Sequence, residues 1–152
     1  SLPIIRKDFI IDPYQIYESK FYEADCILII MKIVGKTQAK ELKTLAEELD
    51  LDVLIEVQSE EEVEKALYLD PKMIGINNRN LENFSTDIEN SIKITRLIPK
   101  GILVISESGI SNTKHINLLM DSGINNFLIG ESLMKSDNIS NKLESLIKGS
   151  VR

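Results

Sequence analysis

The sequence predicts an α/β fold in which parallel strands alternate with helices, and three observations lead to this class. Six short apolar runs recur along the chain without polar alternation, which is typical of strands buried on both faces. Amphipathic segments with helix-start signals lie between these runs. The runs begin about 25 residues apart, which leaves room for a helical crossover between parallel strands.

The six predicted strands are rich in Ile, Leu and Val. They are Leu2 to Ile5, Ile27 to Ile30, Val53 to Ile55, Met73 to Ile76, Ile102 to Ile105 and Phe127 to Ile129. The first helix is expected to begin at Pro13 after the capping residue Asp12, and Ser59 to Glu62 has the sequence of a capping box. The further expected caps are Asp87 and either Ser111 or Asn112, and the remaining helices are Thr37 to Leu49 and Ile139 to Ile147.

Length and composition favour a single soluble domain over residues 1–152. The chain is 43% hydrophobic and 28% charged, as in ordinary globular proteins. Its formal charge of −6 disfavours binding to nucleic acid. No apolar run is long enough to span a membrane, and the first residues lack a signal-peptide pattern, so we expect a cytoplasmic protein with no membrane partner. The single cysteine, Cys26, and the single histidine, His115, are too few for a zinc site or a nucleophilic triad, and we expect a buried thiol and a surface imidazole.

Two architectures fit the alternating pattern: an open doubly wound sheet, and a (β/α)8 barrel of which the chain holds about six units. A dinucleotide-binding sheet has a glycine-rich turn after its first strand. Here that strand is followed by Arg6, Lys7 and Asp8, and the first glycine is Gly35. The sequence therefore favours the incomplete barrel.

Polar residues follow each apolar run. They are Arg6 to Asp8, Lys32, Glu56, Asn77 to Asn80, Glu107 to Gly109, and Gly130 to Ser132. Because the carboxyl ends of parallel strands emerge on one side of a sheet, these side chains are expected to converge. A lysine and two glutamates at the ends of buried strands need partners, so we expect ion pairs or a bound ligand.

The last two strand ends have the pattern of a phosphate site. Ser108-Gly109 and Gly130-Glu131-Ser132 each place small residues before a helix start, where backbone N–H groups attract anions. Barrels commonly build this site after their seventh and eighth strands. If so, the six strands are the third to eighth of a barrel.

Five stretches of the sequence resemble the indole-3-glycerol-phosphate synthase family. They are Pro3 to Ile16 (PIIRKDFIIDPYQI), Leu54 to Val57 (LIEV), Ile74 to Leu81 (IGINNRNL), Glu107 to Ile110 (ESGI) and Phe127 to Met134 (FLIGESLM), in the order and spacing of that family. The resemblance implies a (β/α)8 barrel and a carboxy-lyase of tryptophan biosynthesis. It implies a phosphorylated substrate, 1-(2-carboxyphenylamino)-1-deoxyribulose 5-phosphate, whose indole ring is closed with loss of carbon dioxide and water and without a metal or organic cofactor.

The resemblance also implies roles for nine residues. Lys7 matches the general acid, with a pKa expected to fall toward neutrality, and Glu56 matches the group that stabilises the cationic intermediate or removes a proton. Asn77, also catalytic, and Arg79 match residues that hold the sugar hydroxyls and developing anionic groups. Glu107 and Ser108 match contacts to the ribulose chain. Gly109, Gly130 and Glu131 match the phosphate site, acting mainly through backbone N–H groups.

The sequence departs from the family in two ways. Its first two βα units and N-terminal extension have no counterpart, so a second catalytic lysine and a glutamate are missing, and we expect the chain to be the C-terminal three quarters of a synthase. Glu23, Asp50 and Asp70 stand where the family usually has glycine after a helix, whereas Gly123 keeps the pattern. Two other hypotheses stay open: a non-catalytic phosphate-binding or self-associating barrel fragment, and another phosphate barrel such as an isomerase or a Schiff-base aldolase.

Overall fold

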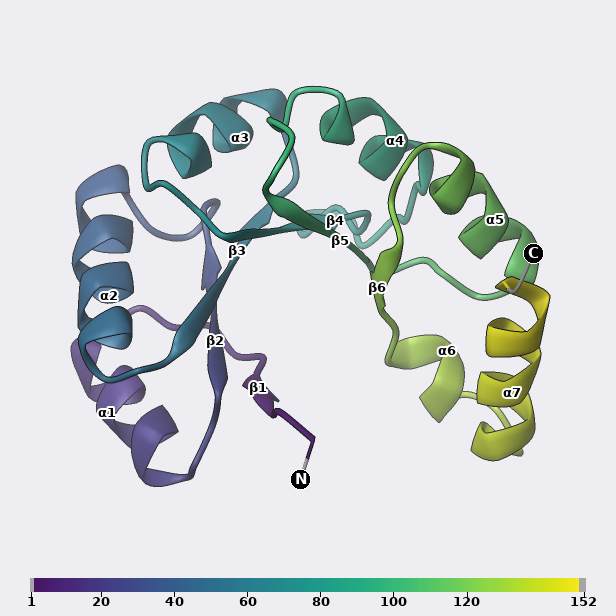
Figure 1. Cartoon of the computed structure of the whole chain (residues 1–152), viewed down its shortest axis with the longest axis horizontal. Coiled ribbons are helices and arrows are strands. Elements are labelled where there is room, and N and C mark those ends of the chain that lie inside the picture. The colour runs from purple at the N-terminus through teal and green to yellow at the C-terminus, as the bar shows by residue number, and fades with distance from the viewer. Residues whose placement is uncertain (1, 151–152) are drawn as a thin grey trace.

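The computed structural model describes residues 2–150 and contains one curled sheet with helices on its outer side (Figure 1). The six strands are parallel and lie in chain order, β1-β2-β3-β4-β5-β6. The first and last strands are the edges of this sheet, and the curl does not close between them (Figure 1). The predicted incomplete barrel of six parallel strands is therefore confirmed.

The strands differ from the predicted runs mainly at their ends. They are β1 Ile5–Arg6, β2 Cys26–Ile30, β3 Asp52–Val57, β4 Met73–Asn77, β5 Leu103–Glu107 and β6 Asn126–Leu128. Glu56, Asn77 and Glu107 lie within strands rather than after them, because the ladder continues past the apolar run and pairs Asn77 with Glu107. The first strand is shorter than predicted: only Ile5 and Arg6 pair with β2, and Leu2 and Ile4 are exposed.

Seven helices lie within the described residues. They are α1 Pro13–Phe21, α2 Lys36–Glu48, α3 Glu60–Leu67, α4 Glu89–Thr95, α5 Thr113–Asp121, α6 Glu131–Met134 and α7 Ile139–Ser150. Asp12, Ser59 and Asn112 accept hydrogen bonds from first-turn amides, as expected of N-caps. The capping box at Ser59 is only half formed, because the Glu62 carboxylate accepts from Gln58 N instead of Ser59 N. Ile88 is the N-cap position of α4, and Asp87 supports this helix by accepting from Glu89 N.

Three helix ends have non-glycine residues in the left-handed region, at the positions predicted from the missing glycines. The φ angles are 58° at Glu23, 53° at Asp50 and 50° at Asp70, and Gly123 has 87°. The backbone bonds of a left-handed C-cap are made nevertheless: Ala24 N donates to Ser19 O and Leu51 N donates to Ala46 O. The three helices thus keep the left-handed ending that usually requires glycine, and each ending carries the strain of a Cβ atom at positive φ.

The main core lies between the sheet and the outer helices. It includes Ile27, Ile29 and Ile55 from the strands and Leu42 and Val63 from α2 and α3. A smaller cluster, built on Leu28, Ile30 and Leu54, covers the inner face. Neighbouring residues of a strand thus point to opposite faces of the sheet. Both faces are covered by apolar side chains, which explains the continuous apolar runs.

Candidate active site

Lys7 connects two buried glutamates at the carboxyl edge of the sheet. Its Nζ lies 3.1 Å from Glu56 Oε2 and 3.0 Å from Glu107 Oε2. The glutamate side chains are 1% and 0% exposed, whereas that of Lys7 is 36% exposed. Residues from the first, third and fifth strands or their ends therefore form one charged cluster, in which the lysine is the member open to solvent.

The environment moves the pKa values of this cluster. The pKa of Glu107 is raised to about 7, chiefly by burial and next by the neighbouring Glu56, against the attraction of Lys7. Burial lowers the pKa of Lys7, but the combined attraction of Glu107 and Glu56 outweighs burial, so the pKa of Lys7 is raised overall. The expected fall in the pKa of Lys7 is therefore wrong, because the lysine is surrounded by carboxylates rather than cations.

Asn77 extends the cluster toward Arg79. Asn77 Nδ2 donates to Glu56 Oε1 over 2.9 Å, and Asn77 Oδ1 accepts from Arg79 N over 2.9 Å. This arrangement orients the Glu56 carboxylate from both sides, with Lys7 on one oxygen and Asn77 on the other. A carboxylate fixed in this way is suited to stabilise a cation in the site.

A cavity of about 600 Å³ opens from Lys7 along the ends of β5 and β6. Its lining includes all of the predicted phosphate residues, and its further members are Lys7, Arg79, Thr86, Ser108, Ile110, Ser111, His115, Leu128, Ile129, Ser132 and Lys135. Sequence reasoning missed His115 and Lys135. The position of His115 in the first turn of α5 was the available signal, since that turn follows the Ser108-Gly109 stretch.

The two expected anion-binding helix starts are weaker than the sequence indicates. The helix after Gly130 is only four residues long, Glu131–Met134, so it aligns few peptide dipoles. At the other helix start, the Ser111 N–H group already donates to His115 Nδ1 over 3.4 Å, so an anion would have to replace this hydrogen bond. The Glu131 side chain, expected to be secondary to its backbone, forms ion pairs with Arg79 and Lys135.

Ser108 is held in a strained conformation at the entrance to this cavity. Its φ angle is 63°, followed by Gly109 at 74°. Asn78 Nδ2 donates to Ser108 O over 3.1 Å and to Ser106 Oγ over 3.0 Å. Asn78 also accepts from Ser91 N and Ser91 Oγ, which ties β4, β5 and α4 together. Strain maintained by a buried network is typical of residues that serve a site.

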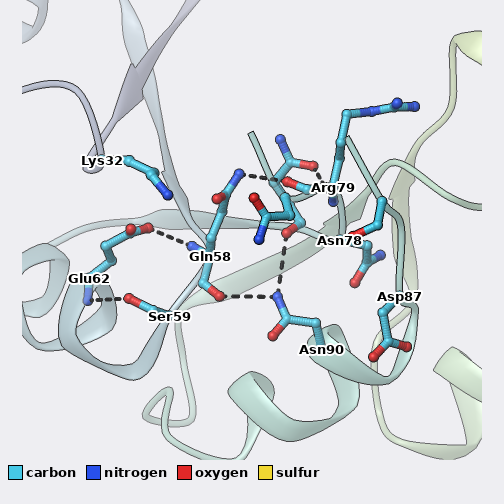
Figure 2. A pocket seen from close by; sticks show the side chains of 11 residues that line it. Lys32, Gln58, Ser59, Glu62, Asn78, Arg79, Asp87 and Asn90 are labelled. Atoms are coloured by element: carbon cyan, nitrogen blue, oxygen red, sulfur yellow. Dashed lines mark hydrogen bonds between the residues drawn. The ribbon is translucent and has the colours of Figure 1, made fainter. Parts of the chain in front are cut away.

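A second cavity of about 380 Å³ lies beside the first, between the ends of β2, β3 and β4 (Figure 2). Gln58 and Asn90 cross-link its wall: Gln58 Nε2 donates to Arg79 O and Asn90 Nδ2 donates to Gln58 O. Lys32 lines this cavity and pairs with Glu82 at 2.9 Å. Arg79 lines both cavities.

Known structures share this fold. Over 97% of this chain and 72% of the other, the structure superposes on 3-hexulose-6-phosphate synthase from Salmonella typhimurium with a TM-score of 0.82 at 11% identity. KGPDC from Streptococcus mutans gives a TM-score of 0.74 at 12% identity, over 97% of this chain and 71% of that one. These likenesses define the fold class, a parallel barrel with outer helices. The sequence identifies the family within this class. The sequence model of the indole-3-glycerol phosphate synthase family matches residues 1–146, and the chain belongs to that family.

Relatives agree with this assignment. The indole-3-glycerol phosphate synthase of Legionella pneumophila (strain Paris) is 50% identical over 147 residues, which are 97% of this chain and 57% of that protein. The one from Endomicrobium trichonymphae is 46% identical over 96% of this chain and 57% of the relative. The tryptophan biosynthesis protein TrpCF of Buchnera aphidicola subsp. Baizongia pistaciae is 45% identical over 97% of this chain and 31% of its own length.

The chain spans a little over half the length of the synthases from Legionella and Endomicrobium. The expected share of three quarters is therefore too large, because the relatives' sequence outside the match exceeds two βα units of about 25 residues each. Family membership does not favour the non-catalytic fragment as an alternative. Among residues 2–150, no helix combines the length and apolar character needed to cross a bilayer. The same part of the chain contains no group of three or more His, Cys, Asp or Glu side chains placed to hold a metal ion.

Proposed function

We propose that this chain, as one domain over residues 1–152, forms the third to eighth βα units of an indole-3-glycerol phosphate synthase. Its substrate is 1-(2-carboxyphenylamino)-1-deoxyribulose 5-phosphate, and the reaction is ring closure followed by loss of carbon dioxide and water. The observation that carries this proposal is the ammonium group of Lys7 between Glu56 and Glu107, at the mouth of the 600 Å³ cavity. The cytoplasmic location and the lack of a nucleic-acid partner stay predictions.

Lys7 is the proton donor in this proposal. Its raised pKa keeps it protonated at neutral pH, so it can protonate the ribulose carbonyl oxygen as the aromatic ring carbon attacks. Its exposure lets it reach a substrate in the cavity, whereas the two glutamates stay buried. Glu56, fixed by Asn77, then stabilises the cationic ring-closed intermediate or removes its proton.

The remaining residues hold the substrate. Arg79 lines both cavities and can make two parallel bonds to an anionic group. Ser108 lines the cavity and contacts the ribulose chain. Glu107, which the sequence also assigned to this contact, is 0% exposed, so it acts on the chain through the Lys7 ammonium group. Gly109, Gly130 and Glu131, which line the 600 Å³ cavity, hold the phosphate.

An indole-product assay tests this function. It compares the chain alone with the chain mixed with the N-terminal segment of the Legionella synthase that lies outside the match. We expect turnover only in the mixture, because residues that act as a unit lose most of their rate enhancement when one is absent. Lys7→Ala should abolish that turnover. Lys100→Ala, which removes an exposed lysine that lines neither cavity, is the matched control.

The other outcomes have definite meanings. Near-normal turnover by the chain alone, abolished by Lys7→Ala, would show that these six units suffice. Inactivity of a folded mixture would favour a non-catalytic phosphate-binding role instead.

A further inference from the structure

The Glu131 carboxylate lies between two cations of the 600 Å³ cavity. Glu131 Oε2 pairs with Arg79 Nη2, from the loop after β4, and Glu131 Oε1 lies 2.5 Å from Lys135 Nζ. The first pair spans 52 positions of sequence and passes over the end of β5, where Ser108 and Gly109 lie. Lys135 and Arg79 lower the pKa of Glu131, so this carboxylate is ionised at neutral pH.

The lysine and arginine side chains that line this cavity are already paired with carboxylates. They are Lys7, Arg79 and Lys135. Lys7 is held by Glu56 and Glu107, and the other two are held by Glu131. Among the described residues that line the cavity, Glu131 is the one with an acidic side chain. An incoming phosphate dianion must therefore compete with an existing ion pair for any of these cations.

Burial decides which pair gives way. Glu56 and Glu107 are almost fully buried, and separating them from Lys7 would leave uncompensated charge out of water. The Glu131 side chain is 49% exposed, so its carboxylate can move into solvent when its partners are taken. Exposed ion pairs add little net stability, and a phosphate dianion bound by two cations can replace them.

We propose that the Glu131 side chain is a tethered competitor for anions, which occupies Arg79 and Lys135 until the phosphate group of the substrate displaces it. The inference rests on the proposed function and deepens it, because it assigns to this side chain the control of phosphate affinity. Glu131 weakens binding of any anion that cannot engage both cations at once. It also returns to Arg79 and Lys135 when the phosphate leaves, which favours release of product.

Titration with inorganic phosphate tests this role on the chain as it exists. The probe is the backbone amide signals of Gly109, Gly130 and Ser132 at neutral pH and low salt. We expect Glu131→Gln to bind phosphate about five- to tenfold more tightly than the unmodified chain, with a smaller gain at high salt. The matched control is Glu144→Gln, because Glu144 and Lys148 form an exposed pair of the same spacing on α7, away from the cavity.

A second variant locates the gain. In the Glu131→Gln background, Arg79→Gln should return the affinity to the unmodified value or below it. An unchanged or weaker affinity in Glu131→Gln overturns the inference, and so does an equal gain in Glu144→Gln, which would indicate a general effect of net charge. Absence of phosphate binding in both the unmodified chain and Glu131→Gln also overturns it. The proposed function is judged separately by the indole-product assay, which does not depend on this titration.

Discussion

The carboxylate of Glu107 fills the space beside Gly75 that a side chain at that position would need. A Cβ atom built on Gly75 would overlap with Glu107 Oε1. Glycine at this position lets Glu107 lean across β4 toward Lys7 and Glu56. The position of the buried Glu107 carboxylate thus depends on the absence of a side chain at Gly75.

We therefore expect Gly75→Ala to displace the Glu107 carboxylate from Lys7. A shift of about 1 Å in a positioned group can cost on the order of a hundredfold in rate. The measurement is kcat of the complemented synthase in the indole-product assay. Gly35→Ala is the control, since a Cβ there meets no atom within 4 Å. A Gly75→Ala protein as active as this control would contradict the dependence.

The raised pKa of Glu107 predicts how stability changes with pH. Its pKa is about 7 in the folded chain, against an ordinary value of 4.5, mainly because it is buried and then because Glu56 is near. Between these two values the folded state holds a proton that the unfolded state has lost, so the free energy of unfolding should fall as pH rises from about 4.5 to about 7. Urea unfolding at several pH values measures this slope, and Glu107→Gln should flatten it. An unaltered slope in that variant would assign the effect to other groups.

Gly130 offers a test of the phosphate site that leaves the fold intact. A Cβ at Gly130 meets no atom within 4 Å, so Gly130→Leu should fold normally and occupy part of the 600 Å³ cavity. We expect inorganic phosphate to lose at least tenfold in affinity, measured by amide chemical shifts. Gly35→Leu, with the same free space at its Cβ, should bind as before. Equal phosphate affinity in both variants would place the anion elsewhere.

The left-handed helix ends offer stabilising substitutions. Glu23→Gly, Asp50→Gly and Asp70→Gly should each raise the free energy of unfolding by about 0.5–1 kcal/mol, because glycine relieves the strain at φ angles between 50° and 58°. Thermal unfolding measures the gain. Gly123→Ala, at φ 87°, should lose stability by a similar amount. A neutral result at all three sites would mean that their side chains compensate for the strain.

The edge of the sheet at β1 predicts self-association. Tyr14, Tyr17 and Phe21 on α1 are exposed beside it, and unpaired strand edges favour pairing with another chain. Sedimentation of the chain should show dimers or larger species. Tyr17→Lys combined with Phe21→Lys should weaken this association at least tenfold. Tyr68→Lys should not, because Tyr68 ends α3, between the central strands β3 and β4 in the chain and not at the β1 edge. A monomer at high concentration would exclude this interface.

The sequence predicted the strands and the cluster far better than the charges that surround it. Apolar runs and caps located five strands and most helix starts, because these signals are local, whereas the first predicted strand shares only Ile5 with β1. The convergence of Glu56, Asn77 and Glu107 at the carboxyl ends of the strands followed from parallel topology alone. By contrast, the pairs of Glu131 with Arg79 and of Lys32 with Glu82 join residues about 50 positions apart through flexible side chains, and no spacing rule foretells them. The pKa of Lys7 was wrongly predicted for the same reason: its sign depends on which charges surround it in space.

The placement of the main core outside the sheet has a consequence for how such a barrel can be divided. Most buried apolar residues lie between a strand and the helices beside it, and few lie on the inner face. Each βα unit is therefore stabilised chiefly by its immediate neighbours, as in a solenoid whose stability is a sum of repeats and their interfaces. Closure of the ring adds only the last interfaces to this sum. A barrel built in this way can be assembled from two separately encoded groups of consecutive βα units. Selection can then exchange one group while the other keeps its fold.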